Sequence, residues 1–328
     1  MTQESAFCEK ARATRPVVIV GAGIAGLACA QRLAQRGVPA ILLDKGRTPG
    51  GRVATRYVEA LQFDHGAQYV TARTAAFSSV LDDLAAQGAA APWRSDAGSN
   101  RVVGTPGMAA LGKALAAGLD VRQGVQVSAV RQVDGGWHVY AGDTLHFAPR
   151  VVVTVPAPQV AGLLGADHPL VAKLGDISIA PCLTLMAAIR ARPSFVTREA
   201  PDAPLSWIAQ DSAKPGRPAV GSGSDAIAWV AQAGAAFSAE HLEDSPADIA
   251  ARMLPLLCEQ LEVTTDRVTY AAAHRWRYAR VTKPLGEPYL LDASRTLYLG
   301  GDWCIGPRVE AAWTSGTAIA DDLLAGIS

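Results

Sequence analysis

Two glycine-rich segments near opposite ends of the chain contain the residue types that hold a redox dinucleotide. The first runs from Val17 to Ala30 and reads VVIVGAGIAGLACA, and the second runs from Leu297 to Ala320 and reads LYLGGDWCIGPRVEAAWTSGTAIA. A dehydrogenase that uses a nicotinamide cofactor needs only the first segment to bind it. A flavoprotein must also hold the far end of a long, buried dinucleotide. The pair of segments therefore predicts FAD as the cofactor.

The first segment has the spacing of a strand, a tight turn and a helix. Four β-branched residues precede the turn, in an apolar run typical of a buried parallel strand. Gly21 permits the turn, Gly23 lets the backbone approach the pyrophosphate, and Gly26 lets the helix pack closely on the strand. The helix is predicted over residues 24–35, with the phosphates at its N-terminus; a chance glycine turn is the alternative. The cofactor contacts predicted here are Gly21, Gly23, Ile24, Ala25 and Gly26.

A carboxylate and a basic loop follow the next predicted strand, residues 41–43. Asp44 ends this strand, where a carboxylate should accept the ribose hydroxyls of the adenosine half. The loop then reads KGRTPGGR and begins at Lys45. In it, Gly51 permits close backbone contact with a phosphate and Arg52 supplies a balancing cation. A solvated basic loop is the alternative interpretation.

Length, composition and charge restrict the class of protein. The 328 residues are 49% hydrophobic and 18% charged, so the chain can bury a substantial core. The 30 Lys and Arg balance the 30 Asp and Glu, which disfavours nucleic acid or an anionic membrane as a partner. No apolar run approaches the length of a membrane span. These features predict a globular protein with a small-molecule substrate.

The cysteines and the N-terminal residues bear on the compartment. Residues 1–15 lack the apolar core of a signal peptide and are predicted to form a mobile tail. The cysteines are scattered without CxxC or Cys/His spacing, which predicts no metal site and a reducing compartment, the cytoplasm by default. They are Cys8, Cys29, Cys182, Cys258 and Cys304.

The predicted fold is α/β with two domains. A doubly wound, Rossmann-like FAD-binding domain is assembled from residues 16–72, 101–158 and 270–328, with a third buried strand at 151–155. A substrate domain with a mixed sheet is inserted as residues 73–100 and 159–269. Strand-like runs at 183–189 and 226–232 and a long helical pattern at 246–261 characterise the inserted part.

Several short motifs are distributed along the chain, namely GAGIAGL, Asp44, PGGR, DHGAQY, VVVTVPAPQ, AHRWRYAR and GGDWCIGPRVEAAW. Together they resemble the flavin-dependent amine oxidase superfamily, and in particular its bacterial renalase-like branch. The resemblance implies a p-hydroxybenzoate-hydroxylase-like two-domain fold, non-covalent FAD, and O2 as electron acceptor with H2O2 as product. It further implies that the substrate is a dihydropyridine isomer of NAD(P)H that gives hydride to flavin N5. A small amine is the alternative substrate, and a flavin-binding redox sensor without turnover is the alternative of another class.

The resemblance also assigns cofactor contacts beyond the phosphate-binding segments. Gly66, Ala67, Gln68 and Tyr69 should lie along the isoalloxazine, and Val127 should contact the adenine through its backbone. The final helix, beginning near Val309, should stabilise negative charge on the flavin pyrimidine with its N-terminus. The remaining expected contacts are Thr154, Pro156, Gly301, Asp302, Arg308, Val309, Glu310 and Ala312.

The residues that would contact the substrate have alternative interpretations. His274 is either an orienting donor or base beside the substrate or a partly buried structural residue. A dihydropyridine needs positioning more than a strong base. Four basic residues either bind the phosphates of a dinucleotide substrate or are solvated charges, namely Lys214, Arg217, Arg277 and Arg280. Five aromatic residues could form a cage around an amine, a flat stacking wall or ordinary core. They are Tyr69, Trp207, Trp276, Trp303 and Trp313.

Overall fold

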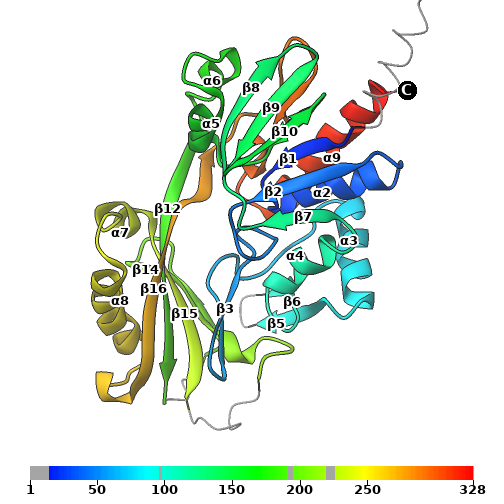
Figure 1. Cartoon of the computed structure of the whole chain (residues 1–328). Helices are drawn as coiled ribbons and strands as arrows, with labels where there is room; N and C mark the ends of the chain where they lie inside the picture. Colours follow the sequence, from blue (N-terminus) through cyan, green and yellow to red (C-terminus); the bar gives the residue numbers. More distant parts are fainter. Residues whose placement is uncertain (1–14, 96–97, 191–194, 219–225, 328) are drawn as a thin grey trace, which may run out of the picture. The chain divides into compact units, whose positions relative to one another are not determined.

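The computed structural model describes residues 15–95, 98–190, 195–218 and 226–327. The predicted mobile tail lies outside the described residues except for Arg15. The chain divides into two compact units. Unit 1 comprises the chain up to Gly51, Leu115–Ser178 and the chain from Val281 onward, and unit 2 comprises Arg52–Ala114 and Ile179–Arg280. The predicted α/β fold, with a Rossmann-like domain and a second domain built on a sheet, is confirmed (Figure 1).

A six-stranded sheet forms the centre of unit 1, in the order β17-β18-β11-β1-β2-β7. Neighbouring strands pair in parallel except for β17 and β18, which are antiparallel. Every residue of β1, β11 and β18 is buried, as expected for apolar strands covered on both faces. The strands are β1 (Val17–Val20), β2 (Ala40–Asp44), β7 (Asp120–Gln123), β11 (Val151–Val153), β17 (Leu290–Leu291) and β18 (Leu297–Leu299).

Two helices of unit 1, α2 (Ile24–Ala34) and α9 (Val309–Ala325), pack against each other. A Cβ atom on Gly316 of α9 would lie 2.0 Å from the carbonyl oxygen of Ala25, so the two backbones are in contact there. The two glycine-rich segments therefore belong to the same unit. Its other elements are β8 (Val127–Val133), β9 (Gly136–Ala141), β10 (Thr144–Ala148), α5 (Ala157–Leu164), α6 (Pro169–Ala172) and η3 (Asp302–Cys304).

A five-stranded sheet forms the centre of unit 2, in the order β13-β14-β15-β12-β16. Its strands are β12 (Ser178–Ile189), β13 (Thr197–Glu199), β14 (Leu205–Gln210), β15 (Ile227–Ala233) and β16 (Val268–Lys283). Two hairpins accompany the sheet, β3 (Thr55–Val58) with β4 (Leu61–Asp64) and β5 (Ala90–Ser95) with β6 (Gly98–Gly104). The helices are α3 (Ala75–Ala86), α4 (Ala109–Leu115), α7 (Ala235–Glu240), α8 (Pro246–Gln260), η1 (Asp211–Ala213) and η2 (Thr265–Arg267).

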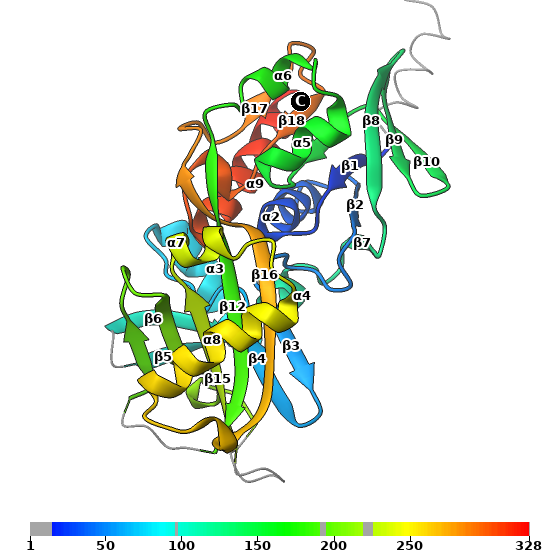
Figure 2. The same ribbon diagram turned by 90° about the vertical axis from the view of Figure 1, so that its left-hand side faces the viewer.

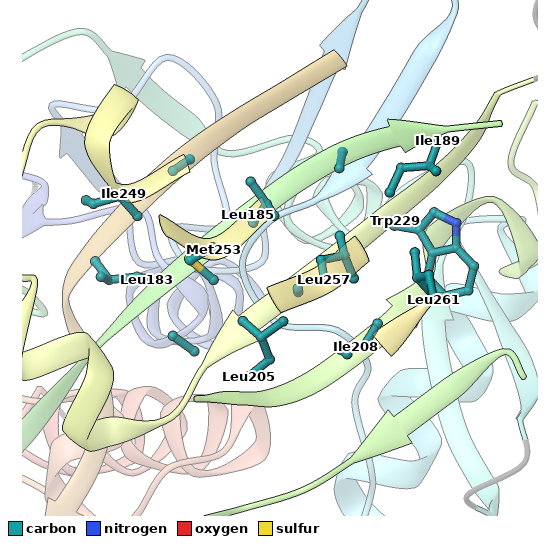
Figure 3. Close-up of a cluster of buried hydrophobic side chains, with 14 of the residues drawn as sticks. Leu183, Leu185, Ile189, Leu205, Ile208, Trp229, Ile249, Met253, Leu257 and Leu261 are labelled. Carbon is teal, nitrogen blue, oxygen red and sulfur yellow. The ribbon is translucent and has the colours of Figure 1, made fainter. Parts of the chain in front are cut away.

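Helix α8 lies against one face of this sheet (Figure 2). Its buried residues Ile249, Met253 and Leu257 recur at the spacing of one helical face. They pack with Leu185 and Trp229 of the sheet, which are also fully buried (Figure 3). Unit 2 therefore has a hydrophobic core of its own.

The observed units divide the chain differently from the predicted domains. Residues 52–72 and 101–114 group with unit 2, because the β3–β4 hairpin packs Phe63 into a core with Met186 and Val230. Residues 270–280 also belong to unit 2, as part of β16. Residues 159–178 group with unit 1, because α5 packs on β8. The predicted boundaries followed the positions of the motifs in the sequence. The observed units follow the packing of these segments, which the motifs do not indicate.

Candidate functional site

The turn after β1 is shaped by its glycines and by Thr154. Gly21 has φ of +104°, a conformation that favours glycine. A Cβ atom on Gly26 would lie 2.0 Å from the carbonyl oxygen of Gly21, so a larger residue cannot fit there. The Thr154 hydroxyl lies 3.0 Å from the Gly21 carbonyl oxygen and 3.1 Å from that of Val20, within donating distance of both. Thr154, predicted as a cofactor contact, therefore holds the turn from the neighbouring strand end.

The N-terminus of α2 is open within the described part of the chain. Gly23 caps the helix without a side-chain hydrogen bond, and the N–H groups of the first turn, which include Ile24 and Ala25, have no intrahelical partner. Apart from its neighbours in the chain, no described residue comes within 4 Å of where a Cβ on Gly23 would stand. Gly51 is close to the backbone of Gly23, because a Cβ added to Gly51 would lie 3.3 Å from the Gly23 Cα. An uncapped helix N-terminus with space before it fits a phosphate group.

Asp44, at the end of β2, connects the phosphate-binding turn to the next loop. Its two carboxylate oxygens accept N–H groups from Ala22 at 2.7 Å and from Gly46 at 2.6 Å. A carboxylate has about four acceptor positions, so capacity remains for ribose hydroxyls. The neighbouring Lys45 is exposed. The assignment of Asp44 to the ribose stays a prediction, and the geometry is compatible with it.

The second glycine-rich segment folds tightly in the interior of unit 1. The Gly301 N–H donates to the Ser315 hydroxyl at 2.9 Å, and the next residue, Asp302, is buried. Trp303 is 1% exposed and donates its indole N–H to the Val155 carbonyl at 3.0 Å. A side chain so enclosed cannot contact a substrate in this conformation. We therefore propose a structural role for Trp303 in place of the predicted substrate contact.

The N-terminus of α9 is also uncapped. Arg308 is its N-cap residue without a side-chain capping bond, and the Arg308 Nε is buried with no hydrogen-bond partner among the described residues. Val309, Glu310 and Ala312 form the first turn, and the Glu310 side chain is buried. The positive end of a 17-residue helix with an unpartnered donor beside it fits a ring that carries partial negative charge.

Three further residues of unit 1 were singled out in the sequence. Val127 is buried at the start of β8, and Pro156 is the N-cap of α5. Burial raises the pKa of the Cys304 thiol to about 12. Cys304 therefore stays protonated, so the structure gives no support to a thiolate reaction there.

In unit 2, the turn Gly66–Tyr69 is held against the backbone of Arg52. A Cβ on Gly66 would lie 2.0 Å from the Arg52 carbonyl oxygen, which accepts the Ala67 N–H at 2.9 Å. The Arg52 guanidinium donates to the carbonyl of Ala279 at 2.8 Å. Gln68 turns its amide group inward, where it donates to the Gly66 carbonyl at 3.1 Å. The side chains of this motif are therefore engaged with unit 2 itself.

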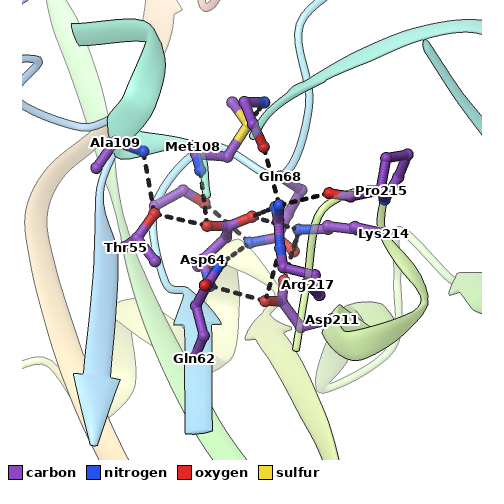
Figure 4. A network of polar contacts seen from close by, with 12 residues as sticks. Thr55, Gln62, Asp64, Gln68, Met108, Ala109, Asp211, Lys214, Pro215 and Arg217 are labelled. Carbon is purple, nitrogen blue, oxygen red and sulfur yellow. Dashed lines mark hydrogen bonds and ion pairs between the residues drawn. The ribbon is translucent and has the colours of Figure 1, made fainter. Parts of the chain in front are cut away.

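Four buried charged side chains form a cluster that contacts this turn through Gln68 (Figure 4). The Lys214 Nζ lies 2.7 Å from Asp211 Oδ1, 3.2 Å from Asp64 Oδ2 and 3.3 Å from Gln68 Oε1. Arg217 pairs with the same oxygen of Asp64, and its Nε lies 3.7 Å from Asp211 Oδ2. All four charged side chains are at most 1% exposed. We call Asp64, Asp211, Lys214 and Arg217 the buried quartet. Neither interpretation offered for its two cations, phosphate binding or solvation, describes this arrangement.

The two carboxylates of the quartet have different acidities. Burial raises the pKa of Asp64, but the nearby Lys214 and Arg217 outweigh burial and bring it below its ordinary value. Burial and the Asp64 charge raise the pKa of Asp211 above its ordinary value. The Thr55 hydroxyl also donates to Asp64, at 2.7 Å. Asp64 is therefore the more strongly held anion, and Asp211 depends on its cationic partners.

Tyr69 and Trp207 form an aromatic pair next to the quartet, with ring centroids 5.6 Å apart. The Trp207 N–H donates to Gln68 Oε1 at 3.3 Å. The guanidinium carbon of Arg101 lies 4.2 Å from the Tyr69 centroid and 4.9 Å from that of Trp207. Two of the predicted aromatic residues thus lie together, and a cation of the chain faces both rings.

His274 and Trp276 lie together elsewhere in unit 2, with centroids 4.3 Å apart. His65 packs against both, 4.8 Å from His274 and 5.4 Å from Trp276, and its carbonyl accepts the Trp276 N–H at 2.7 Å. The pKa of each imidazole is lowered to about 4, chiefly by burial and in part by the charge of Arg56. Both rings are therefore neutral near pH 7. His274 and Trp276 are only partly buried, so each has surface available for a small molecule.

Sequence reasoning missed four residues of these clusters. Asp64 and His65 lie within the DHGAQY motif, so the motif itself was a signal for them. Arg101 and Asp211 have no local signal, since nothing in their immediate sequence separates them from solvated charges. Of the predicted aromatic residues, the structure brings together Tyr69 with Trp207 only.

Within the described ranges of the chain, no helix combines the length and the apolar character needed to cross a membrane. Within the same ranges, no group of three or more His, Cys, Asp or Glu side chains is arranged to hold a metal ion.

Family comparisons match nearly the whole chain. The family described as NAD(P)-binding Rossmann-like domain matches residues 19–84, and the family described as flavin containing amine oxidoreductase matches residues 83–324. Hydroxyneurosporene desaturase of Rubrivivax gelatinosus is 47% identical over 60 residues, which are 18% of this chain and 11% of the desaturase. The match thus spans about a tenth of that relative.

Solved structures resemble the chain over 95% of its length. A protein assigned as a protoporphyrinogen oxidase from an Exiguobacterium species has a TM-score of 0.78, at 14% identity and with 99% of its own chain covered. Wild-type putrescine oxidase bound to putrescine has a TM-score of 0.69, at 15% identity and with 99% covered. At such identities the likeness concerns the fold. The amine oxidoreductase match covers well over half of the chain, so this protein belongs to the flavin containing amine oxidoreductase family.

Proposed function

We propose that the protein is a renalase-like oxidase, which oxidises dihydropyridine isomers of NAD(P)H and uses O2 as the electron acceptor. When bound, FAD would supply a two-electron acceptor for hydride, and its reoxidation by O2 with a proton would give H2O2. The protein residues have to bind the cofactor, orient the dihydropyridine and avoid protonating it.

Unit 1 supports the assignment of the FAD-binding residues. We assign the pyrophosphate to the uncapped N-terminus of α2 at Gly23, because that terminus has space before it and no side-chain cap. Asp44 would accept the ribose hydroxyls with its remaining acceptor capacity. The N-terminus of α9 at Arg308 would stabilise negative charge on the flavin pyrimidine.

The observation that carries the substrate proposal is the neutral imidazole of His274 beside the indole of Trp276. A dihydropyridine becomes aromatic when it loses hydride, so it needs a flat surface and a hydrogen-bonding group more than a base. His274 and Trp276 offer both on partly buried side chains. The low pKa of His274, about 4, keeps a proton away from the ring nitrogen of the substrate near pH 7.

A small amine is the second candidate, and the family match favours it. An amine must lose its proton before it can give up hydride, which a base or an aromatic cage assists. A partly buried neutral imidazole with a pKa of about 4 is a poor base at pH 7, because proton transfer to it is unfavourable. We therefore rank the amine second.

Anaerobic flavin reduction separates the two candidates. Purified FAD-loaded protein is mixed without O2 with 6-dihydroNAD(P) isomers and, separately, with a panel of small amines, and the flavin absorbance is followed. We expect rapid bleaching by the dihydropyridines and slow or no bleaching by the amines. Rapid bleaching by amines alone would refute the renalase-like proposal.

The cofactor assignment has its own test. Asp44→Ala should lower the amount of FAD that stays bound through gel filtration, because the ribose loses an acceptor. Arg36→Ala, a substitution of an exposed residue after α2, is the matched control and should retain FAD as the unmodified protein does. Full FAD content in Asp44→Ala would count against the ribose assignment.

A further inference from the structure

The aromatic pair Tyr69–Trp207 has the geometry of a cation site, and the chain fills that site itself. The ring planes are inclined by 51°, with centroids 5.6 Å apart, so a positive group can lie near both faces. The guanidinium of Arg101 does so, within the ~6 Å at which a ring quadrupole attracts a cation.

Arg101 is held in place by backbone pairing. The N–H of Val70 donates to the Val102 carbonyl at 2.8 Å, and the N–H of Val102 donates back to Val70 at 2.9 Å. Tyr69 and Arg101 are the immediate neighbours of these two residues. The bridge therefore fixes the distance between the ring and the cation.

Glu199 completes the arrangement. It forms an ion pair with the Arg101 guanidinium, and in the β13–β14 pairing it stands directly opposite Trp207. The Arg101 side chain is 9% exposed, whereas that of Glu199 is 45% exposed. Arg101 thus has a carboxylate and two aromatic rings as neighbours, which is a complete set of partners for a cation.

A second cation of the chain lies at the same cluster of rings. Trp93 packs edge-on against Trp207 at 6.5 Å, and the Lys214 Nζ lies 5.4 Å from the Trp93 ring. The aromatic surface formed by these rings therefore meets positive charge from both Arg101 and Lys214. A substrate ammonium brought to the Tyr69–Trp207 pair would have to displace the Arg101 guanidinium from both rings and from Glu199.

We propose that Arg101 occupies the aromatic pair in place of a substrate ammonium group and thereby selects against cationic amines. The proposal deepens the proposed function, because it rests on Tyr69 and Trp207 lying at the substrate. If Arg101 excludes cationic amines, the substrate group that meets these rings is uncharged. A dihydropyridine ring meets that condition.

Removing the guanidinium should convert the pair into an ammonium site. We compare the FAD-loaded R101A variant with the unmodified protein by calorimetric titration, using tetramethylammonium and, as a neutral probe of similar size, tert-butanol. R101A retains Tyr69, Trp207 and Glu199, so it should bind tetramethylammonium about tenfold more tightly than the unmodified protein does. Its preference for the cation over tert-butanol should increase by a similar factor.

Arg198→Ala is the matched control. The Arg198 guanidinium also faces an aromatic ring, at 4.2 Å from the centroid of Phe195, but it is exposed and bonds to Gln260. This variant should bind tetramethylammonium no better than the unmodified protein. If R101A does not fold, R101Q serves instead, since it removes the charge and keeps most of the volume.

Two results would overturn the proposal. One is a folded, FAD-loaded R101A or R101Q variant that shows no gain in preference for tetramethylammonium. The other is saturable binding of tetramethylammonium to the unmodified protein with the affinity expected of the variant. Neither depends on turnover, so a failure of dihydropyridines to bleach the flavin of the unmodified protein would count against the proposed function separately.

Discussion

Replacing Lys214 by methionine should destabilise the protein by about 3–5 kcal/mol, because it removes one partner from a buried ion cluster. Methionine has a similar length and no charge, so the volume is nearly conserved. The carboxylate most affected is Asp211, whose Oδ1 lies 2.7 Å from the ammonium nitrogen. Its other cationic neighbour, the Nε of Arg217, is 3.7 Å from Oδ2. The variant thus leaves Asp211 buried with one weaker partner.

The magnitude follows from the distances. At an effective dielectric constant of ~20, attractions over the Lys214 distances of 2.7 Å to Asp211 and 3.2 Å to Asp64 are about 6 and 5 kcal/mol. The lost hydration of the buried charges offsets much of this, so the intact quartet contributes little net stability. Removing one cation leaves the lost hydration of the carboxylates uncompensated. The single variant should therefore lose more stability than the intact quartet contributes.

The assay is urea unfolding of FAD-loaded protein, followed by circular dichroism and tryptophan fluorescence. The double variant Lys214→Met/Asp211→Asn should recover much of the loss, because it removes the unpaired charge as well. The loss in the single variant should also shrink as the pH falls, since protonation of Asp211 neutralises it, and the pKa of Asp211 already lies above its ordinary value. Glu243→Gln is the control, since it breaks an exposed ion pair with Arg277 and should leave the urea midpoint unchanged.

Two outcomes would refute this reasoning about the quartet. A loss below about 1 kcal/mol in the single variant would show that Asp211 finds another partner or water. A double variant less stable than the single one would show that the pair contributes net stability as a pair. In either case the quartet would not be an interdependent buried cluster.

Other substitutions and conditions test the phosphate-binding turn and the histidine pair. Gly26→Ala should lower both the FAD content and the urea midpoint of the FAD-free protein, because its Cβ would lie 2.0 Å from the Gly21 carbonyl oxygen. Gly23→Ala should lose FAD and keep that midpoint, since its Cβ position is open. Full FAD content in either variant, or an equal fall of the midpoint in both, would contradict these roles. The folded-state pKa of His65 and of His274, about 4, lies below the ordinary 6.5, so protonation favours the unfolded state. Thermal stability should therefore be constant above about pH 6.5 and fall as the pH decreases toward 4. The fall should be smaller in His65→Gln. An equal fall in that variant would show that His65 does not cause the pH dependence. For the same reason, the rate of anaerobic flavin reduction by a dihydropyridine should not change through ionisation of His274 between about pH 6 and 9. A sigmoidal step in a stopped-flow pH series would show that His274 is not neutral throughout this range.

The parts of the fold that the sequence predicted are those with local causes. The apolar run before Gly21 is β1, and the helix predicted at 24–35 is α2, Ile24–Ala34. The helix predicted at 246–261 is α8, Pro246–Gln260, because its apolar residues recur at helical spacing. In these segments the residues that determine the structure are neighbours in the chain.

The parts that could not be predicted depend on contacts between distant residues. Lys214 and Asp64 are 150 positions apart, and no pattern around either one indicates that they are paired and buried. Arg101 and Glu199, which are 98 positions apart, present the same difficulty. Charged residues are exposed far more often than buried, so solvation was the reasonable expectation. The domain boundaries were affected for the same reason, since the β3–β4 hairpin packs on a core formed by residues far along the chain.

The DHGAQY motif acquires a different meaning from these contacts. Its aspartate belongs to the buried quartet, and its glycine allows the Arg52 carbonyl to approach to within 2.0 Å of a Cβ position. Its glutamine accepts from Lys214 and Trp207 at 3.3 Å, so its amide faces the interior of unit 2. The aspartate and the glutamine side chains therefore anchor the turn within unit 2. Substitutions in the motif should therefore act on FAD through the position of the turn, and their effect on FAD content should follow their effect on the stability of unit 2.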